Sequence, residues 1–214
     1  SFGNATLREA HTNRSPYAYD FNPAEWKDKY DSNQDDSFSL IKFEESGASK
    51  AFASFYAVHG TALSANNTLT SVDNKGLAAL WYEQEAEPDS LPGQNSFIAG
   101  FIQASVGDTS PNTLGARCED GSPCDYETST CIGSNGKNTT STCIGRGPGF
   151  GDEAARELSP TGGYDWRSNE IIARLQVDAA KGIMDRTDLL SLSGTVKSAK
   201  MNVDMNSYTF TLPN

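Results

Sequence analysis

The sequence predicts an α/β fold in which a mixed sheet with flanking helices carries a long, disulfide-pinned loop. Between residues 50 and 104, a strand-like segment, a polar loop, a helical segment and a second strand-like segment follow one another, the order of an α/β unit. Four cysteines lie close together in a stretch rich in Gly, Ser, Asn and Thr: Cys118, Cys124, Cys131 and Cys143. No internal repeat or long linker divides the chain, so residues 1–214 are predicted to be a segment of a single domain.

The first regular element is expected only after residue 36. Residues 1–36 lack hydrophobic periodicity and contain many turn-forming residues. An apolar run over 38–43, a turn at 44–47 and a second apolar run over 51–58 then predict a β-hairpin.

A helix and a buried strand are predicted next. Apolar residues recur at helical spacing over 74–85, where Asp73 and Asn74 are suited to capping the helix and Pro88 to ending it. The near-continuous apolar run over 97–104, bounded by polar residues, predicts a buried strand.

Two further elements are expected after the cysteine-rich stretch. Helical spacing of apolar residues predicts a helix over 168–184. From Leu189 onward the chain has a strand-like character, with alternation at Tyr208, Phe210 and Leu212. The chain stops within this alternation and begins without a start methionine or a signal-peptide core, so we expect a partial domain.

The composition excludes some classes of partner. The chain has 28 Asp and Glu against 17 Lys and Arg, a formal net charge of -11. A nucleic-acid binder gains most of its affinity by neutralising phosphates, so no nucleic-acid partner is expected. The same balance argues against a polybasic grip on anionic lipid, and no apolar run is long enough to predict a membrane span.

The cysteine spacing favours disulfides over a metal site. The four cysteines are separated by five, six and eleven residues, whereas zinc sites typically contain closely spaced Cys pairs. Two disulfides imply an oxidising compartment, and Asn-x-Ser/Thr sequons at Asn4, Asn13, Asn66 and Asn138 point the same way. We therefore expect a secreted or cell-surface glycoprotein.

His59 is the first candidate for a functional residue. It follows the predicted strand over 51–58 and precedes Gly60. Ligand-binding and catalytic groups gather at such strand ends in open α/β sheets. The alternative is a structural histidine whose ring nitrogens are satisfied within the fold.

Ser110 and Arg14 are the other candidates. Ser110 lies in a Gly/Pro-rich turn after a predicted strand, where a hydroxyl can be presented to a cleft, although an ordinary Asp/Ser turn has the same residues. Arg14 lies in a turn before Pro16 and can hold a carbonyl or carboxylate oxygen, but surface arginines more often form salt bridges. The chain lacks the G-x-S-x-G elbow of α/β-hydrolases.

Several segments together resemble the neutral/alkaline ceramidase family. The similarity runs from about residue 10 to about residue 185. Its most specific part is the Gly-Asp-x-Ser-Pro-Asn sequence at 107–112, which leads into Leu-Gly-x-Arg-Cys at 114–118. The other matching segments are Asn13-Arg14-Ser15-Pro16-Tyr17, Ala57-Val58-His59, Ser71-x-Asp73-Asn74-Lys75-Gly76, Leu91-Pro92-Gly93-Gln94 and Ile144-x-Arg146-Gly147-Pro148-Gly149.

The resemblance implies a role for each candidate. His59 matches a histidine ligand of the family's catalytic Zn²⁺, Ser110 its catalytic serine, and Arg14 the arginine thought to contact the substrate near its amide. It also implies the crossed disulfides Cys118–Cys131 and Cys124–Cys143. The implied reaction is hydrolysis of the amide bond of ceramide, a sphingolipid presented at a membrane surface.

The sequence also departs from the family pattern. The upstream His-x-His segment that supplies the family's first zinc ligand does not occur here, and its Glu and Tyr ligands are expected beyond Asn214. His11 is not a substitute, because it precedes the Asn-Arg-Ser-Pro segment, where the family has no ligand. Gly60 stands where the family usually has Pro. One ligand cannot hold catalytic zinc, so we expect the remaining ligands from other parts of the same catalytic domain.

Two alternatives to an enzyme segment of this kind remain. The chain could be a secreted binding module for lipid or glycan on a ceramidase-like scaffold, in which case its gene lacks the missing ligands. It could also be a serine hydrolase that needs no metal, whose activity would survive a chelator and be lost in Ser110→Ala.

Overall fold

The predicted hairpin forms the middle of a four-stranded sheet. In this computed structural model, which describes residues 1–118, 120–125, 128, 130–133, 135–139, 143–155, 163–209 and 211, the strand order is β1-β3-β4-β5. Their bounds are Phe2–Thr6 for β1, Ser37–Glu45 for β3, Ala48–Tyr56 for β4 and Ile98–Gln103 for β5. β1–β3 and β3–β4 are antiparallel and β4–β5 is parallel, so the predicted mixed sheet is confirmed.

The turn between β3 and β4 uses two residues with positive φ. Ser46 has φ 51° and Gly47 has φ 80°. Consecutive positive φ values are typical of hairpin turns whose twist matches that of the paired strands. The turn sets the register in which Glu45 lies opposite Ala48, and an irregularity between Phe43 and Glu44 then shifts the pairing by one residue.

The α/β unit predicted over 50–104 is present. β4 leads through a loop into helix α3 (Asp73–Ala86), which returns the chain to β5. A parallel strand pair needs such a crossover, since the chain must travel back along the sheet before it can pair in the same direction. The second long helix, α4, spans Tyr164–Met184 and begins earlier than predicted.

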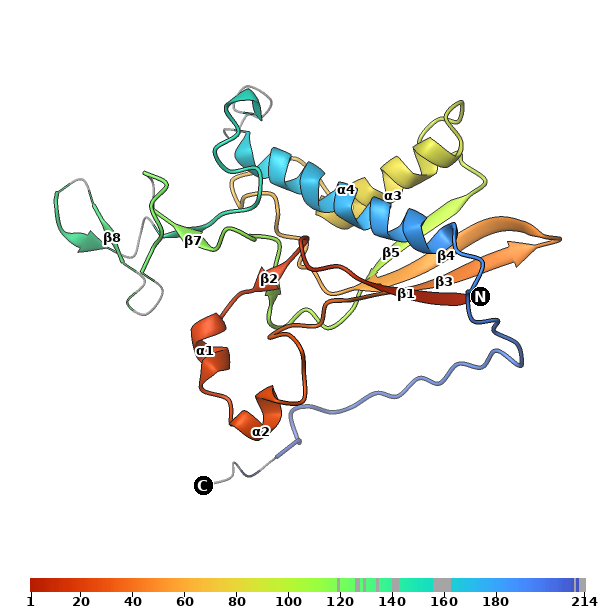
Figure 1. The fold of residues 1–214 in the computed structure, drawn as a ribbon, viewed down its shortest axis with the longest axis horizontal. Coiled ribbons are helices and arrows are strands. Elements are labelled where there is room, and N and C mark those ends of the chain that lie inside the picture. The colour runs from red at the N-terminus through yellow and green to blue at the C-terminus, as the bar shows by residue number, and fades with distance from the viewer. Residues whose placement is uncertain are drawn as a thin grey trace.

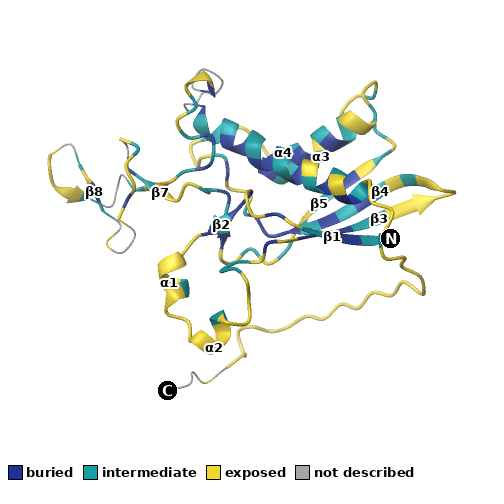
Figure 2. Cartoon of the chain, in the orientation of Figure 1, coloured by how far each residue is buried: buried dark blue, intermediate teal, exposed yellow. Residues whose placement is uncertain are grey.

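Both long helices, α3 and α4, lie side by side on one face of the sheet (Figure 1). The hydrophobic core forms between these helices and the sheet. Figure 2 shows buried positions, in dark blue, on both the sheet and the helices. Buried residues of the strands and of both helices form one hydrophobic cluster. The largest are Phe38, Leu40, Phe52 and Tyr56 from the sheet, and Ile172, Val177 and Ile183 from α4. Each fully buried aliphatic or aromatic side chain of this size contributes about 1.5–3 kcal/mol.

No described helix covers the opposite face of the sheet. Phe43, Ile98 and Ile102 are oriented toward that face and remain 50%, 62% and 43% exposed. The strand over 97–104 was predicted to be buried, but only Ala99 in β5 is buried. That expectation is wrong for the described structure, because only the face toward α3 is covered.

Residues 1–36 contain elements that the sequence analysis did not predict. Besides β1, they form the short strand β2 (Thr12–Asn13) and two short helices, α1 (Pro16–Asp20) and α2 (Ala24–Lys27). These elements are too short to show a hydrophobic period, and β1 pairs with β3 through backbone hydrogen bonds that leave little trace in side-chain pattern.

The strand expected in the C-terminal tail is not formed by the described residues. Leu190 exchanges two backbone hydrogen bonds with Phe2, both 2.8 Å, and residues 191–209 are then exposed and irregular. Phe210 and Leu212 lie outside the described residues. Alternation produces a strand only where a partner edge accepts its hydrogen bonds, and no described segment offers one to Tyr208. None of the described helices has the length and apolar character needed to cross a membrane.

Candidate functional site

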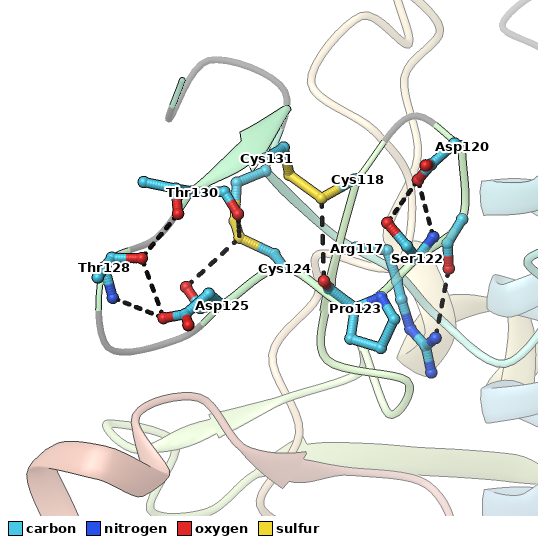
Figure 3. Close-up of a disulfide and its surroundings, with 12 residues drawn as sticks. Arg117, Cys118, Asp120, Ser122, Pro123, Cys124, Asp125, Thr128, Thr130 and Cys131 are labelled. Carbon is cyan, nitrogen blue, oxygen red and sulfur yellow. Dashed lines mark hydrogen bonds between the residues drawn. A yellow bond between two sulfur atoms is a disulfide. The ribbon is translucent and has the colours of Figure 1, made fainter. Parts of the chain in front are cut away.

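The four cysteines form the crossed pairs that the family resemblance implied. Cys118 pairs with Cys131 and Cys124 with Cys143, with Cα–Cα distances of 5.6 and 5.8 Å. Cys118, Cys124 and Cys131 are buried against one another (Figure 3). A metal site there would need free thiolates, so the alternative zinc interpretation of the cysteines is wrong in this structure.

Short pairings build the loop around the disulfides. β7 (Ala116–Arg117) pairs with β10 (Ile144–Gly145) at its base, and β8 (Cys131–Ile132) pairs with β9 (Asn138–Thr139) farther out. Side chains cap its turns, as when Asp120 accepts hydrogen bonds from the backbone and hydroxyl of Ser122 (Figure 3). The loop is therefore a folded projection, joined at its base to the sequence that carries Ser110.

A two-stranded ladder brings Arg14 and Ser110 together. β2 pairs with β6 (Thr109–Ser110), with Thr12 opposite Ser110. The ladder continues one residue further, because the Arg14 backbone N–H donates to the Asp108 carbonyl at 2.8 Å. Segments about a hundred residues apart in sequence thus lie side by side, as Figure 1 shows for β2 and the strand behind it.

All three sequence-predicted site residues line one open cavity of about 750 Å³. Arg14 and Ser110 reach it from the ladder, and His59 from the loop that follows β4. Gly145 and Cys124 complete it from the disulfide-pinned loop. The cavity therefore lies where the end of β4, the ladder and the base of the loop meet.

His59 and His11 have different environments. The His11 ring is fully buried, with Nδ1 2.6 Å from the Ala57 carbonyl and Nε2 3.0 Å from Asp36 Oδ1. Burial raises the pKa of Asp36, but hydrogen bonds from His11, Ser32 and Gln34 outweigh it and leave that pKa lowered. His11 is thus a structural histidine, consistent with its rejection as a metal ligand. The partly exposed His59 ring has no hydrogen-bond partner among the described residues.

Ser110 and Arg14 also keep functional groups available. The Ser110 hydroxyl accepts the Asn112 backbone N–H at 3.1 Å, which fixes its position in the turn. That bond uses a lone pair and leaves the hydroxyl proton free to be donated. The Arg14 side chain is exposed and forms no ion pair with the described residues. The salt-bridge alternative for Arg14 therefore finds no support in the described structure.

Two neighbours of Ser110 were missed by the sequence analysis. Thr109 lines the same cavity, is fully buried, and its hydroxyl has no hydrogen-bond partner in the described part of the chain. Asn112 and Gly145 line both this cavity and an adjacent one of about 410 Å³. Neither Thr109 nor Asn112 has a distinctive sequence signal, since both are ordinary residues of a polar turn.

The described residues around the cavity do not provide all the ligands that a metal site needs. His59 offers one free imidazole to the cavity, and zinc prefers such nitrogen ligands. Within the described residues, the only group of three potential metal-binding side chains is Cys118, Cys124 and Cys131, whose sulfurs are in disulfides. The residues present therefore fit a zinc site as one ligand of several.

The glycosylation sequons differ in exposure. Asn4, Asn66 and Asn138 are exposed, whereas Asn13 is buried and its side-chain amide donates to the Asn33 carbonyl at 2.6 Å. A glycan on Asn13 is incompatible with this packing.

The fold and the cavity together define the class of protein. A mixed α/β sheet with a cavity at a strand end, lined in part by His, Ser and Arg, is an arrangement that enzymes of α/β type use for substrate binding. The family described as "Neutral/alkaline non-lysosomal ceramidase, N-terminal" matches residues 1–214. The chain belongs to this family.

Individual relatives agree with this assignment. Neutral ceramidase A of Dictyostelium discoideum is 46% identical over 193 residues, which cover 89% of this chain and 25% of that protein. The Drosophila melanogaster neutral ceramidase is 32% identical over 210 residues, 95% of this chain and 27% of that protein. The chain thus spans about a quarter of the length of these relatives.

Two solved structures share the fold. One, a ceramidase complexed with C2, matches with a TM-score of 0.57 and 22% identity over 88% of this chain and 22% of that one. The other is the neutral ceramidase from Pseudomonas aeruginosa, with a TM-score of 0.54 and 22% identity over the same shares of the two chains.

Proposed function

We propose that this chain is part of a zinc-dependent amidohydrolase that cleaves the amide bond of ceramide. The observation that carries the proposal is the single cavity lined by His59, Ser110 and Arg14, which come from three separate segments. Membership of the neutral/alkaline ceramidase family supports the substrate class.

The proposed chemistry uses each of the three residues. His59 is one protein ligand of Zn²⁺, which when bound polarises a carbonyl or activates water. Ser110 supplies a hydroxyl to the reacting amide, as nucleophile or proton donor, and Arg14 holds an oxygen of the acyl group through charge-assisted hydrogen bonds. Overall the C–N bond breaks, water supplies OH to the acyl carbon and H to the nitrogen, and the products are a sphingoid base and a fatty acid.

The chain alone is proposed to be incomplete. Catalytic zinc sites use about three protein ligands, and His59 is the only one that we propose among the described residues. The other ligands would come from further parts of the same catalytic domain, of which residues 1–214 form a segment. We further propose that the protein is secreted or displayed on the cell surface, since the two disulfides suit an oxidising compartment, and meets ceramide at a membrane surface.

The test uses the full-length product of the gene and a ceramide hydrolysis assay. Ser110→Ala is expected to lower kcat by at least about 100-fold, because a group acting on the reacting amide is lost. Ser207→Ala is the matched control: Ser207 lies in the exposed tail, so its variant should retain wild-type activity. Equal activity of the two variants contradicts the role of Ser110, and wild-type activity that survives zinc removal contradicts the role of the metal.

The second candidate is a binding module for lipid or glycan that does not catalyse. Two observations favour this binding module as the alternative: the volume of the cavity, about 750 Å³, and the Arg14 side chain, which has no ion-pair partner among the described residues. It predicts that the full-length wild-type protein binds ceramide vesicles or a glycan array but releases no fatty acid, with or without added zinc.

A further inference from the structure

Where the chain leaves β4, side chains of neighbouring elements donate hydrogen bonds to its backbone carbonyl groups. At the last residue of the strand, Lys75 Nζ donates to the Tyr56 carbonyl at 3.0 Å, and two residues further on the Gln103 side-chain amide donates to the Val58 carbonyl. The His59 carbonyl accepts the side-chain amide of Asn74 at 2.9 Å. Backbone that has left a sheet needs such partners when buried, because each unsatisfied group costs about 1–3 kcal/mol.

Asn74 connects this exit to both long helices. It lies in the first turn of α3 and is fully buried. Its side-chain oxygen accepts the amide of Gln176, a fully buried residue of α4, at 3.0 Å. Gln176 in turn accepts a hydrogen bond from Lys75 Nζ at 3.0 Å. A single amide group thus joins α3, α4 and the backbone of His59.

Asp73 holds the segment on the other side of His59. Its two carboxylate oxygens accept the backbone N–H groups of Ala62 and Leu63 at 3.0 and 2.9 Å. Asp73 has φ 54°, an uncommon value for a residue with a side chain, which shows that the tertiary contacts determine its conformation. The sequence analysis assigned Asp73 and Asn74 to helix capping. That assignment is wrong, because α3 begins at Asp73, Val72 is at the N-cap, and no side chain forms a capping hydrogen bond. The two side chains instead bond to the segment that follows β4.

We propose that Asn74 is a positioning residue for His59: its amide, oriented by Gln176, fixes the His59 backbone and so directs the imidazole into the cavity. The His59 ring has no partner of its own among the described residues, so its direction depends on the backbone that carries it. The importance of this for catalysis rests on the proposed function, whereas the positioning itself does not. Partners that orient a metal ligand commonly change metal affinity or activity by 10–100-fold when they are lost.

The experiment exploits the histidine count, since the chain has only two. Ring signals of His11 and His59 are recorded by NMR on the 214-residue chain, and His59→Gln assigns its own signal. Asn74→Asp keeps an acceptor for Gln176 but removes the donor to His59. It is expected to shift or broaden the His59 signal and to leave the His11 signal in place.

Asn95→Asp is the matched control. Asn95 donates its side-chain amide to the Glu83 carbonyl at 3.1 Å, near the opposite end of α3. This variant loses the same kind of bond but should leave the His59 signal unchanged. Gln176→Glu is a second variant, used also if Asn74→Asp does not fold: it removes the donor that orients Asn74 and should displace the same signal. An unchanged His59 signal in a folded variant of Asn74 or Gln176 overturns the proposal, as does an equal displacement in the control.

A second measurement separates this proposal from the proposed function. In the full-length protein, Asn74→Asp is expected to weaken zinc binding by about 10–100-fold, measured by competition with a chelating dye. If the wild-type protein binds no zinc and hydrolyses no ceramide, the proposed function fails, and the NMR result still decides whether Asn74 positions His59. If the wild type binds zinc and Asn74→Asp binds it equally well, the positioning proposal fails alone.

Discussion

At the scale of single residues, the sequence offered candidates for the site, and the structure shows how these candidates are placed. His59, Ser110 and Arg14 were candidates because strand ends and rigid turns present such groups, but only the family resemblance implied a role for each of them. That they share one cavity could not be predicted from spacing, since it depends on the β2–β6 ladder, whose strands are two residues long. Thr109 and Asn74 were not selected for the site because their roles arise from burial.

Lys75 predicts a pH dependence of stability. Burial lowers its pKa from 10.5 to about 7, so between these values the folded chain binds fewer protons than the unfolded chain. The free energy of unfolding should therefore rise with pH across this window, by up to about 1.4 kcal/mol per pH unit from this group, and the destabilisation is complete below about pH 7. Urea denaturation from pH 7 to 9.5 measures the slope.

The control for this measurement is Lys75→Met, which removes the titrating group. Its slope between pH 7 and 9.5 should be smaller than that of the wild type, whatever its absolute stability. The upper limit of pH 9.5 avoids Tyr82, whose pKa burial and the nearby Asp185 and Glu85 raise to about 12, and Tyr56, whose pKa burial raises further. Equal slopes for the two proteins would show that Lys75 does not carry the effect.

At the scale of elements, prediction from the sequence succeeded where apolar residues recur with a clear helical or strand period. The hairpin, both long helices and the β4-α3-β5 unit were predicted to within a few residues. β1 was missed because Phe2–Thr6 has no alternation of its own and becomes a strand only by pairing with β3. The tail was wrong for the converse reason: Tyr208 belongs to an alternating segment, but no described strand edge lies beside it.

The contact between the Arg146–Gly149 segment and α4 depends on glycine. A Cβ on Gly149 would lie 2.6 Å from the backbone nitrogen of Ser168, whose hydroxyl accepts the Gly149 N–H at 3.0 Å. Gly149→Ala should therefore destabilise the fold by about 1–3 kcal/mol, as overpacking does elsewhere. The measurement is the midpoint of chemical denaturation.

Gly182, which lies in α4 itself, provides a control in which alanine is expected to have the opposite effect on stability. It is exposed in α4, and a Cβ there would meet no atom within 4 Å. Gly182→Ala should stabilise by about 0.5–1 kcal/mol, because alanine loses less backbone entropy in a helix than glycine does. Similar effects of the two substitutions would argue against close packing as the cause at Gly149.

At the scale of the whole molecule, the proposed incompleteness of the zinc site can be tested directly. Because His59 is the one zinc ligand that we propose among the described residues, the 214-residue chain is expected to bind zinc weakly and to hydrolyse no ceramide. Isothermal titration of the chain with Zn²⁺, with His59→Gln as the comparison, measures this. Tight one-to-one binding by the wild-type chain would show that its own residues complete the site.

The uncovered face of the sheet and the exposed tail are also features of the whole molecule, and the uncovered face affects how copies of the chain associate. Phe43, Ile98 and Ile102 form an apolar surface on one side of the sheet, and β5 lies at its edge. Apolar surface and free strand edges invite association between copies. Measurements on the isolated chain are therefore best made at low protein concentration, with the oligomeric state checked by light scattering.

The crossed order of the disulfides has a consequence for how the chain survives damage. Any single peptide bond broken between Cys118 and Cys143 lies inside at least one of the two closed rings, so both parts of the chain stay covalently joined. Pairing neighbours in sequence, Cys118 with Cys124 and Cys131 with Cys143, would instead leave residues 125–130 as a place where one cut separates the molecule. The exposed Lys137 is an accessible target for a protease that cuts after lysine, and a cut there is bridged by Cys124–Cys143. The crossed rings thus allow a projecting loop to be nicked without releasing the segment that closes the cavity.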